Sequence, residues 1–165
     1  MTKKETEWIS IPMTVDVPYR FAAGQYLTRC LTELRDNGKL LAVECPECKR
    51  VQLPPRIVCA ECHVKNGRWV ELGSEGTLVG FTIMYLPMTD PTTGKPHDPP
   101  FVYGSIRLDG ATSVLDHFVH VEPDLAKVWI GMRCRMVLRP REDRIGDLND
   151  ILYFDPLPGQ KKPQA

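Results

Sequence analysis

The sequence has 165 residues and a mass of 18.7 kDa, which allows one domain or two small ones. Its 21 lysines and arginines balance 21 aspartates and glutamates, so the formal net charge is zero. This balance argues against a general nucleic-acid binder, which normally carries a basic excess. A hydrophobic fraction of 42% and a charged fraction of 25% are ordinary for a globular protein and exclude a chain that is disordered throughout.

The sequence also argues against a membrane or secreted protein. No apolar run approaches the roughly 18 residues of a spanning helix. Residues 1–8 are polar and lack the apolar segment of a secretory signal. We therefore expect a cytoplasmic protein, and in that compartment six cysteines do not form a disulfide framework.

The N-terminal part, residues 1–38, reads as an arm followed by a helix. Apolar residues alternate with polar ones between positions 9 and 17, a period of two that predicts an extended segment. Prolines at 12 and 18 exclude a central strand, and a disordered terminus is the alternative. Residues 19–37 carry leucines at helical spacing, and Asn37-Gly38 predicts the end of that helix.

Residues 39–72 contain the strongest motif in the chain, two Cys-x2-Cys pairs separated by ten residues. The four cysteines are Cys45, Cys48, Cys59 and Cys62. Two such pairs can aim four thiolates at one ion, which predicts a zinc ribbon. A site with four protein ligands leaves no position for water, so the zinc is expected to be structural. Iron in a rubredoxin-like site uses similar ligands.

Basic charge gathers in the same segment. From Cys45 to Trp69 the sequence holds five basic residues and two acidic ones. One interpretation is that these cations offset the anionic metal centre. The other is an anion site for phosphates, with Arg50 and Arg56 as the candidate contacts, because arginine can donate two parallel hydrogen bonds to a phosphate.

Residues 73–156 predict an all-β domain, and residues 157–165 a tail rich in proline and lysine. The expected strands span 77–86, 101–108, 112–121, 133–139 and 150–154, with a long proline-rich loop over 87–100 and one helical turn over 122–126. Five short strands with a helical turn between the third and the fourth match an OB-fold barrel. A β-sandwich is the alternative. The predicted fold class is therefore mainly β, with a helix, a zinc ribbon and a five-stranded barrel.

No catalytic machinery is evident in the sequence. There is no phosphate-binding glycine motif and no nucleophile beside a base. His117 and His120 lie on opposite faces of one predicted strand, because their separation is odd. Cys30 and Cys134 fall in apolar periodic patterns, which is typical of small buried hydrophobes. We therefore expect no catalytic residue in this chain.

The sequence resembles the rubredoxin-like zinc-ribbon/OB-fold proteins that are associated with acyl-CoA enzymes. The resemblance covers roughly residues 19–156 and depends on motifs in chain order: Asn37-Gly38-Lys39-Leu40-Leu41, the two cysteine pairs, Pro54-Pro55-Arg56, Trp69-Val70-Glu71, Gly76-Thr77-Leu78, Gly131-Met132-Arg133-Cys134 and Tyr153-Phe154-Asp155-Pro156. The arm at 1–18 falls outside it.

The resemblance implies an accessory subunit rather than an enzyme. Members of this family assemble with thiolase-like enzymes, or with acyl-CoA hydratases, and the partner carries the catalytic residues. Length and arm look most like the small subunit of a two-component thiolase, with 2-benzoylsuccinyl-CoA as a candidate substrate and the CoA thioester near the subunit interface. The alternatives are a scaffold for a hydratase and an OB-fold nucleic-acid module; the net negative charge after Trp69 argues against the latter.

Overall fold

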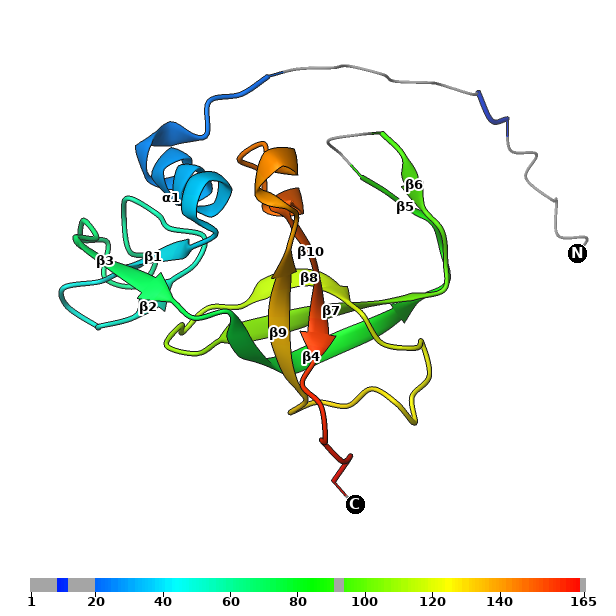
Figure 1. The fold of residues 1–165 in the computed structure, drawn as a ribbon. Helices are drawn as coiled ribbons and strands as arrows, with labels where there is room; N and C mark the ends of the chain where they lie inside the picture. Colours follow the sequence, from blue (N-terminus) through cyan, green and yellow to red (C-terminus); the bar gives the residue numbers. More distant parts are fainter. Residues whose placement is uncertain (1–8, 12–19, 91–93, 164–165) are drawn as a thin grey trace, which may run out of the picture.

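The computed structural model of the chain describes residues 9–11, 20–90 and 94–163 (Figure 1). The described helices and strands are α1 Gly24–Asn37, β1 Leu40–Glu44, β2 Val51–Gln52, β3 Arg68–Leu72, β4 Glu75–Met84, β5 Met88–Thr89, β6 Pro96–His97, β7 Phe101–Leu108, β8 Leu115–Val119, β9 Arg133–Leu138, the 3₁₀ turns η1 Arg141–Asp143 and η2 Leu148–Asp150, and β10 Ile151–Pro156. Most of the predicted N-terminal arm lies outside the described residues; within residues 9–11, Ile9 and Ile11 are exposed.

The predicted helix is present, but it begins at Gly24 and not at residue 19. Its buried face is centred on Cys30 and Leu34, whereas Arg20, Phe21 and Ala22 are exposed and add little burial to support a further helical turn. The helix ends as expected at Gly38, whose φ of 68° is the left-handed conformation that glycine adopts without strain. The Gly38 N–H donates to the Leu34 carbonyl at 3.1 Å, which closes the last turn.

The zinc-ribbon segment forms a three-stranded antiparallel sheet in the order β2-β1-β3. α1 packs against this sheet through its aromatic contacts with β3. The Tyr26 ring lies 5.2 Å from the Trp69 ring, and the Arg29 guanidinium carbon lies 4.4 Å above the centre of the same indole. A cation above an indole face is an attractive pairing, so α1 is held by stacking as well as by apolar burial.

The C-terminal domain is a closed five-stranded barrel with the order β10-β8-β7-β4-β9 (Figure 1). β10 pairs antiparallel with β9 and parallel with β8, and this closure is the predicted OB-fold barrel rather than a sandwich. A bulge between Leu78 and Gly80 bends β4, which lets its first part pair with β9 while its full length pairs with β7.

Two connections differ from the sequence prediction or refine it. The segment over 87–100 was expected to be a loop, but it contains the short β5–β6 hairpin, with Met88 opposite His97. The proline at position 96 argued against a strand in the sequence analysis. Proline is nevertheless tolerated in an edge strand, which is where Pro96 lies. Between β8 and β9 the chain makes hydrogen-bonded turns, in which the Val128 N–H donates to the Asp124 carbonyl at 3.1 Å and the Met132 N–H to the Trp129 carbonyl at 3.3 Å. Val128 and Met132 are buried in the core.

Ribbon, helix and barrel share one hydrophobic core. Its buried members include Leu34 of α1, Leu40 of β1 and Phe154 of β10. The β7–β8 connection also fastens the barrel to the ribbon: Thr112 donates to the Val51 carbonyl from both its N–H and its hydroxyl, each at 2.9 Å. Since the two parts share buried surface and hydrogen bonds, we expect them to unfold together.

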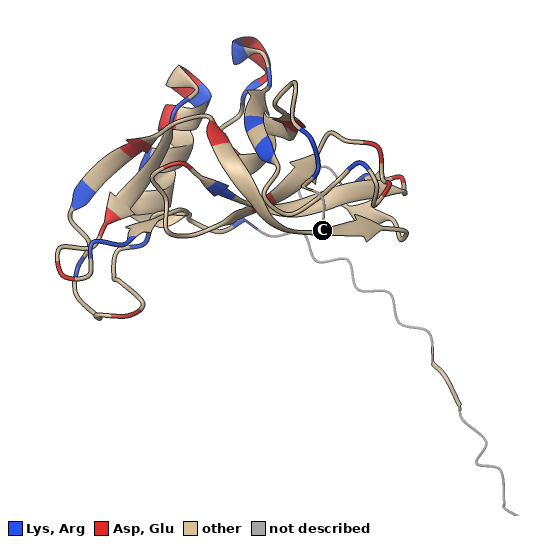
Figure 2. Cartoon of the chain, turned by 90° about the horizontal axis from the view of Figure 1, so that it is seen from below, with Lys and Arg blue, Asp and Glu red and all other residues tan. Residues whose placement is uncertain are grey.

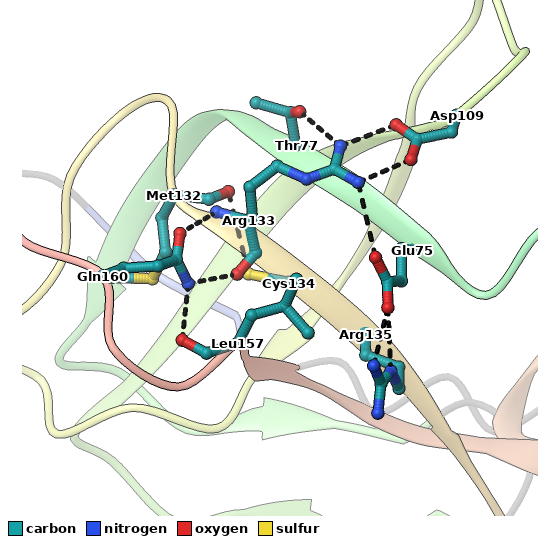
Figure 3. A network of polar contacts seen from close by, with 9 residues as sticks. All are labelled: Glu75, Thr77, Asp109, Met132, Arg133, Cys134, Arg135, Leu157 and Gln160. Atoms are coloured by element: carbon teal, nitrogen blue, oxygen red, sulfur yellow. Dashed lines mark hydrogen bonds and ion pairs between the residues drawn. The ribbon is translucent and has the colours of Figure 1, made fainter.

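A polar network around Arg133 joins β4, β9 and the β7–β8 turn (Figure 3). The guanidinium donates to both carboxylate oxygens of Asp109, in the β7–β8 turn, at 2.6 and 2.5 Å, and to the Thr77 hydroxyl at 3.1 Å. The Gln160 side chain accepts from the Arg133 N–H at 2.6 Å and donates to the Arg133 carbonyl at 2.7 Å. The first residues of the predicted tail are therefore bound to the barrel.

Charged residues of both signs are interspersed over the described part of the ribbon and the barrel (Figure 2). Many pair locally, as Lys39 does with Glu71 at 2.9 Å and Arg135 with Glu75 at 2.6 Å. Many charged side chains of the described residues are therefore neutralised by a neighbour of opposite sign.

Candidate metal centre

The four predicted cysteines meet at one point of the ribbon. The sulfur atoms of Cys45, Cys48, Cys59 and Cys62 all lie within 4.8 Å of one another, and the Cys48 and Cys59 sulfurs are 3.8 Å apart. Four sulfurs about 2.3 Å from a zinc ion lie about 3.8 Å from one another in a tetrahedron. The geometry and the all-thiolate donor set therefore fit a structural zinc ion.

The two cysteine pairs form matching knuckles. In the first, the Cys45 N–H donates to the Arg50 carbonyl at 2.9 Å, and the Cys45 carbonyl accepts from the Lys49 N–H at 3.1 Å. In the second, Cys59 makes the same two bonds, its N–H donating to Val64 at 2.9 Å and its carbonyl accepting from His63 at 3.0 Å.

The residue after each knuckle takes a left-handed backbone conformation. Lys49 has a φ of 59° and His63 a φ of 55°. These two positions turn the chain tightly enough for the backbone to close on the metal, at a small conformational cost. The exposed His63 is thus a turn residue and does not join the four sulfurs.

The knuckle backbone also favours an ionised ligand. The N–H groups of Cys62 and Glu61 point at the Cys59 sulfur and lower the pKa of its thiol to about 7. The Cys62 thiol shares its proton with Cys48, which raises its pKa to about 12. Four adjacent thiolates repel one another, so a divalent cation must be bound before all four ionise.

A partly buried amide network supports the centre, and the sequence analysis did not identify it. The Gln52 Nε2 group lies 3.7 Å from the Cys59 sulfur, and the buried Asn66 donates from Nδ2 to Gln52 Oε1 at 3.0 Å and to the Arg56 carbonyl at 2.9 Å. The Tyr26 hydroxyl donates to the Asn66 carbonyl at 2.8 Å. Asn66 therefore connects α1 to the metal ligands. Its place between the second knuckle and β3 was the only available signal.

The structure separates the two candidate phosphate contacts. Arg50 lies in the first knuckle, where its Nη1 pairs with the Glu61 carboxylate at 2.8 Å. Arg56 lies between β2 and the second knuckle. Its side chain is exposed, and within the described residues its guanidinium has no hydrogen bond or ion pair. Arg56 is thus the cation more available to an external anion.

The remaining cysteines lie away from the metal centre. Cys30 and Cys134 are buried, and loss of solvation raises the pKa of both thiols, that of Cys134 to about 11. His117 is buried and His120 exposed, as their odd separation predicted; His120 pairs with Asp155 at 3.0 Å. In the described part of the chain, no helix has the length and apolar character that crossing a bilayer requires.

Fold and metal centre together define the class: a small protein in which a four-cysteine zinc ribbon leads into an OB-fold barrel. Two family models match it, the rubredoxin-like zinc ribbon domain of ChsH2 over residues 32–66 and the C-terminal OB-fold domain of ChsH2 over residues 69–139. The matched ranges together cover more than half of the chain. It belongs to the zinc-ribbon/OB-fold family that these models describe.

Known proteins agree with this assignment. A DUF35 domain-containing scaffold protein of Methanocaldococcus jannaschii is 25% identical over 136 residues, covering 79% of this chain and 91% of that protein. The Ltp2-ChsH2(DUF35) aldolase structure matches with a TM-score of 0.57 and 22% identity, over 83% of this chain and 98% of the matched one. A DUF35 protein of unknown function from Sulfolobus solfataricus matches with a TM-score of 0.51 and 19% identity, over 79% and 80% of the two chains.

Proposed function

We propose that this chain is the non-catalytic subunit of a two-component acyl-CoA thiolase, in which a partner subunit carries the catalytic residues. The observation that carries the proposal is an exposed stretch beside the metal centre. Ile57 and Val58 are 50% and 46% exposed, and they follow the exposed Arg56. Apolar side chains beside an arginine are the composition that protein interfaces favour.

The state of the cysteines supports an accessory role. A thiolase needs an ionised thiol as nucleophile and a base to activate it. Four cysteines face one another in the metal centre, and burial keeps the thiols of Cys30 and Cys134 protonated at neutral pH. The structural relative solved as the Ltp2-ChsH2 aldolase supports assembly with a catalytic partner.

Arg56, with Arg50 beside the first knuckle, is the proposed contact for the CoA phosphates or for the partner surface that holds them. The Arg56 guanidinium is exposed, while its carbonyl is fixed by Asn66 at 2.9 Å. A backbone that is already positioned loses less entropy when the side chain binds an anion. Arg50 has guanidinium nitrogens besides the Nη1 that pairs with Glu61.

Co-purification tests the assembly. A tagged full-length chain is recovered from native extract, and its partner is identified by mass spectrometry. We expect a thiolase-like subunit, CoA-dependent cleavage of an acyl-CoA by the complex, and none by the chain alone; 2-benzoylsuccinyl-CoA is the first substrate to assay. Recovery of a hydratase or of nucleic acid instead, or cleavage by the isolated chain that is lost on replacing Cys30 or Cys134, would contradict the proposal.

The CoA contact is tested in the assembled complex. Loss of a charged hydrogen bond costs about 1.5–3 kcal/mol, or roughly ten- to a hundredfold in CoA affinity. We expect this loss in an Arg50→Ala/Arg56→Ala double variant, and none in Arg107→Ala, an exposed arginine of β7. Unchanged CoA affinity in the metal-replete double variant would leave both arginines with the role of offsetting the thiolate charge.

A further inference from the structure

The barrel carries a second feature, remote in sequence from the metal ligands: a cavity of about 610 Å³ between the β5–β6 hairpin and the barrel wall. Strands β7, β8 and β10 and the η2 turn supply the other walls. In Figure 1 the hairpin and the η1–η2 connection rise from the same end of the barrel. The volume lies in the range of small-molecule sites, which is about 300–1,000 Å³.

A buried histidine lines this cavity with an unsatisfied nitrogen. His117 is only 7% exposed, and within the described residues its Nδ1 has no hydrogen-bond partner. Burial lowers the pKa of His117 to about 4, so the ring is neutral at neutral pH. A buried polar atom without a partner is destabilising, and a ligand group that bonds to it would remove this cost.

A half-buried arginine lines the same cavity. The Nε group of Arg139 donates to the Asn149 carbonyl at 2.7 Å, which fixes the orientation of the guanidinium plane. In the part of the chain that the structure describes, its two terminal nitrogens have no hydrogen bond or ion pair. Such a pre-positioned pair of donors matches the two oxygens of a carboxylate.

The remaining lining combines apolar and aromatic side chains with charged ones. Both carboxylates of the lining accept a hydrogen bond, Asp116 from the Ser105 hydroxyl at 2.5 Å and Asp90 from Asn149 Nδ2 at 3.2 Å, and Lys95 adds a second positive charge.

The Phe118 ring lies 4.3 Å from the His97 ring of the hairpin and 5.3 Å from the Tyr103 ring of β7. Met88 and Ile151 add aliphatic surface to the same cavity. These rings meet in tilted and edge-to-face arrangements, which aromatic groups favour, so an aromatic ligand ring suits this lining.

The η2 side of the cavity is rigidly built. The buried Asp150 carboxylate accepts from the N–H groups of Ile145 at 2.9 Å and Gly146 at 2.8 Å, and Asp147 caps η2 through a bond from the Asn149 N–H at 2.9 Å. Because these bonds fix the backbone that carries Leu148 and Asn149, the cavity has a preformed wall.

We propose that this cavity binds a small aromatic hydroxycarboxylic acid. The carboxylate pairs with the Arg139 guanidinium, the ring packs against Phe118, and the hydroxyl bonds to His117 Nδ1. A hydroxyl suits this position because it can donate or accept, and so serves either tautomer of the neutral imidazole. The inference does not depend on the thiolase assembly, because all the groups belong to this chain.

The test uses the full-length, zinc-loaded chain and the probe phenyllactate. Two matched probes dissect the contacts: hydrocinnamate lacks the hydroxyl, and phenyllactamide lacks the charge. We expect His117→Phe to weaken phenyllactate about tenfold and to leave hydrocinnamate unchanged, whereas Arg139→Gln weakens both about tenfold. The exposed His120→Phe and Arg107→Gln serve as controls and should leave both affinities unchanged.

Isothermal titration calorimetry gives the affinities, and the His117 ring signals in NMR spectra report the site. Absence of saturable phenyllactate binding up to about 10 mM, equal binding of phenyllactamide, or unchanged affinity in both folded variants would overturn the proposal. If His117→Phe raises stability without weakening phenyllactate, the orphan nitrogen is structural only and the proposal fails. Should a variant not fold, nuclear Overhauser effects between the probe ring and Phe118 in the wild-type chain decide, and their absence refutes it.

Discussion

At the scale of single residues, the metal ligands differ sharply in their surroundings. Cys45 and Cys59 are fully buried, while Cys48 is exposed. The buried first cysteine of each pair makes the knuckle hydrogen bonds, and the second closes the tetrahedron. Exchange or oxidation of the centre would therefore start from the exposed Cys48 side.

We expect Cys59→Ser to lose the metal and unfold the ribbon. A neutral hydroxyl replaces a buried thiolate that bonds to two backbone N–H groups and to the ion. Elemental analysis of the purified variant should show less than one zinc per chain, whereas Cys30→Ala, at a buried thiol outside the cluster, should retain it. Wild-type protein that contains neither zinc nor iron would contradict the structural-metal assignment.

Asn66 is the residue whose loss should affect the centre most without removing a ligand. Asn66→Ala deletes the donor to Gln52 and to the Arg56 carbonyl, which leaves two partly buried acceptors without this partner. We expect a loss of about 1–3 kcal/mol in the free energy of unfolding and faster zinc transfer to a chelator. Tyr26→Phe removes only the bond to the Asn66 carbonyl, and should cost about 1 kcal/mol. Chelator kinetics that are identical to those of the wild type would contradict a supporting role.

At the scale of elements, the Arg133 network joins the β7–β8 turn to β4 and β9 (Figure 3). Backbone pairing already joins β4 to β9. The side-chain network therefore fixes the position of the β7–β8 turn against these strands and supplies only a small part of the stability. The pair with Asp109 is partly exposed and bidentate. An exposed pair of this kind contributes at most about 1 kcal/mol.

This pair makes a testable contribution to acid stability. The hydrogen bonds from Arg133 lower the pKa of the Asp109 carboxyl in the folded chain. A lowered folded-state pKa means that the stabilisation is complete above the unfolded pKa of about 3.9 and is lost as the pH falls through the folded value. In urea unfolding, Asp109→Asn should therefore be less stable than the wild type at neutral pH, with the difference vanishing at acidic pH.

Added salt and a control substitution distinguish the contribution of the Arg133–Asp109 pair from the effect of removing any negative charge. About 1 M salt should shrink the difference at neutral pH, because it screens an exposed pair. Asp98→Asn, at an exposed position near the β6 strand, should show no such pH-dependent difference. A difference between Asp109→Asn and the wild type that persists unchanged at pH 2 would show that the ion pair is not its source.

At the scale of the whole molecule, we expect ribbon and barrel to unfold as one unit. They share a hydrophobic core, and a pair of hydrogen bonds between Ser113 and Leu53, the Ser113 clamp, joins them. The Ser113 hydroxyl accepts from the Leu53 N–H at 2.7 Å and donates to the Leu53 carbonyl at 2.8 Å. Leu53 is itself buried, so both backbone groups depend on Ser113 for their bonds. A metal-dependent ribbon is thereby coupled to the barrel that carries the cavity.

Removing the Ser113 hydroxyl should make unfolding of the ribbon and the barrel less cooperative. Ser113→Ala leaves the N–H and carbonyl of Leu53 without their side-chain partner, and we expect a loss of about 1–3 kcal/mol in the free energy of unfolding. Calorimetry should also show the ribbon unfolding ahead of the barrel, as a broader transition than in the wild type. Ser74→Ala, at an exposed serine, is the control. Equal stability of the two variants would mean that the shared core alone couples the parts.

The sequence by itself determined the metal ligands, because each pair needs only four consecutive residues to form its knuckle. It determined the five barrel strands for a similar reason: the alternation of apolar and polar residues is a local pattern. The strand predicted over 101–108 is observed as Phe101–Leu108, and the OB-fold class followed from the number of strands and the place of the helical turn among them.

Tertiary structure alone decided the features that depend on distant partners. Parity placed His117 and His120 on opposite faces, but only the folded barrel showed that His117 is the buried one and that its Nδ1 has no hydrogen-bond partner among the described residues. Asn66 acquired its role because α1 and β2 both fold against it, and the β5–β6 hairpin contacts the barrel where the His97 ring packs directly against Phe118. Local sequence sets the backbone period, whereas burial and pairing across the chain are set by closure of the fold, which no short window of sequence contains.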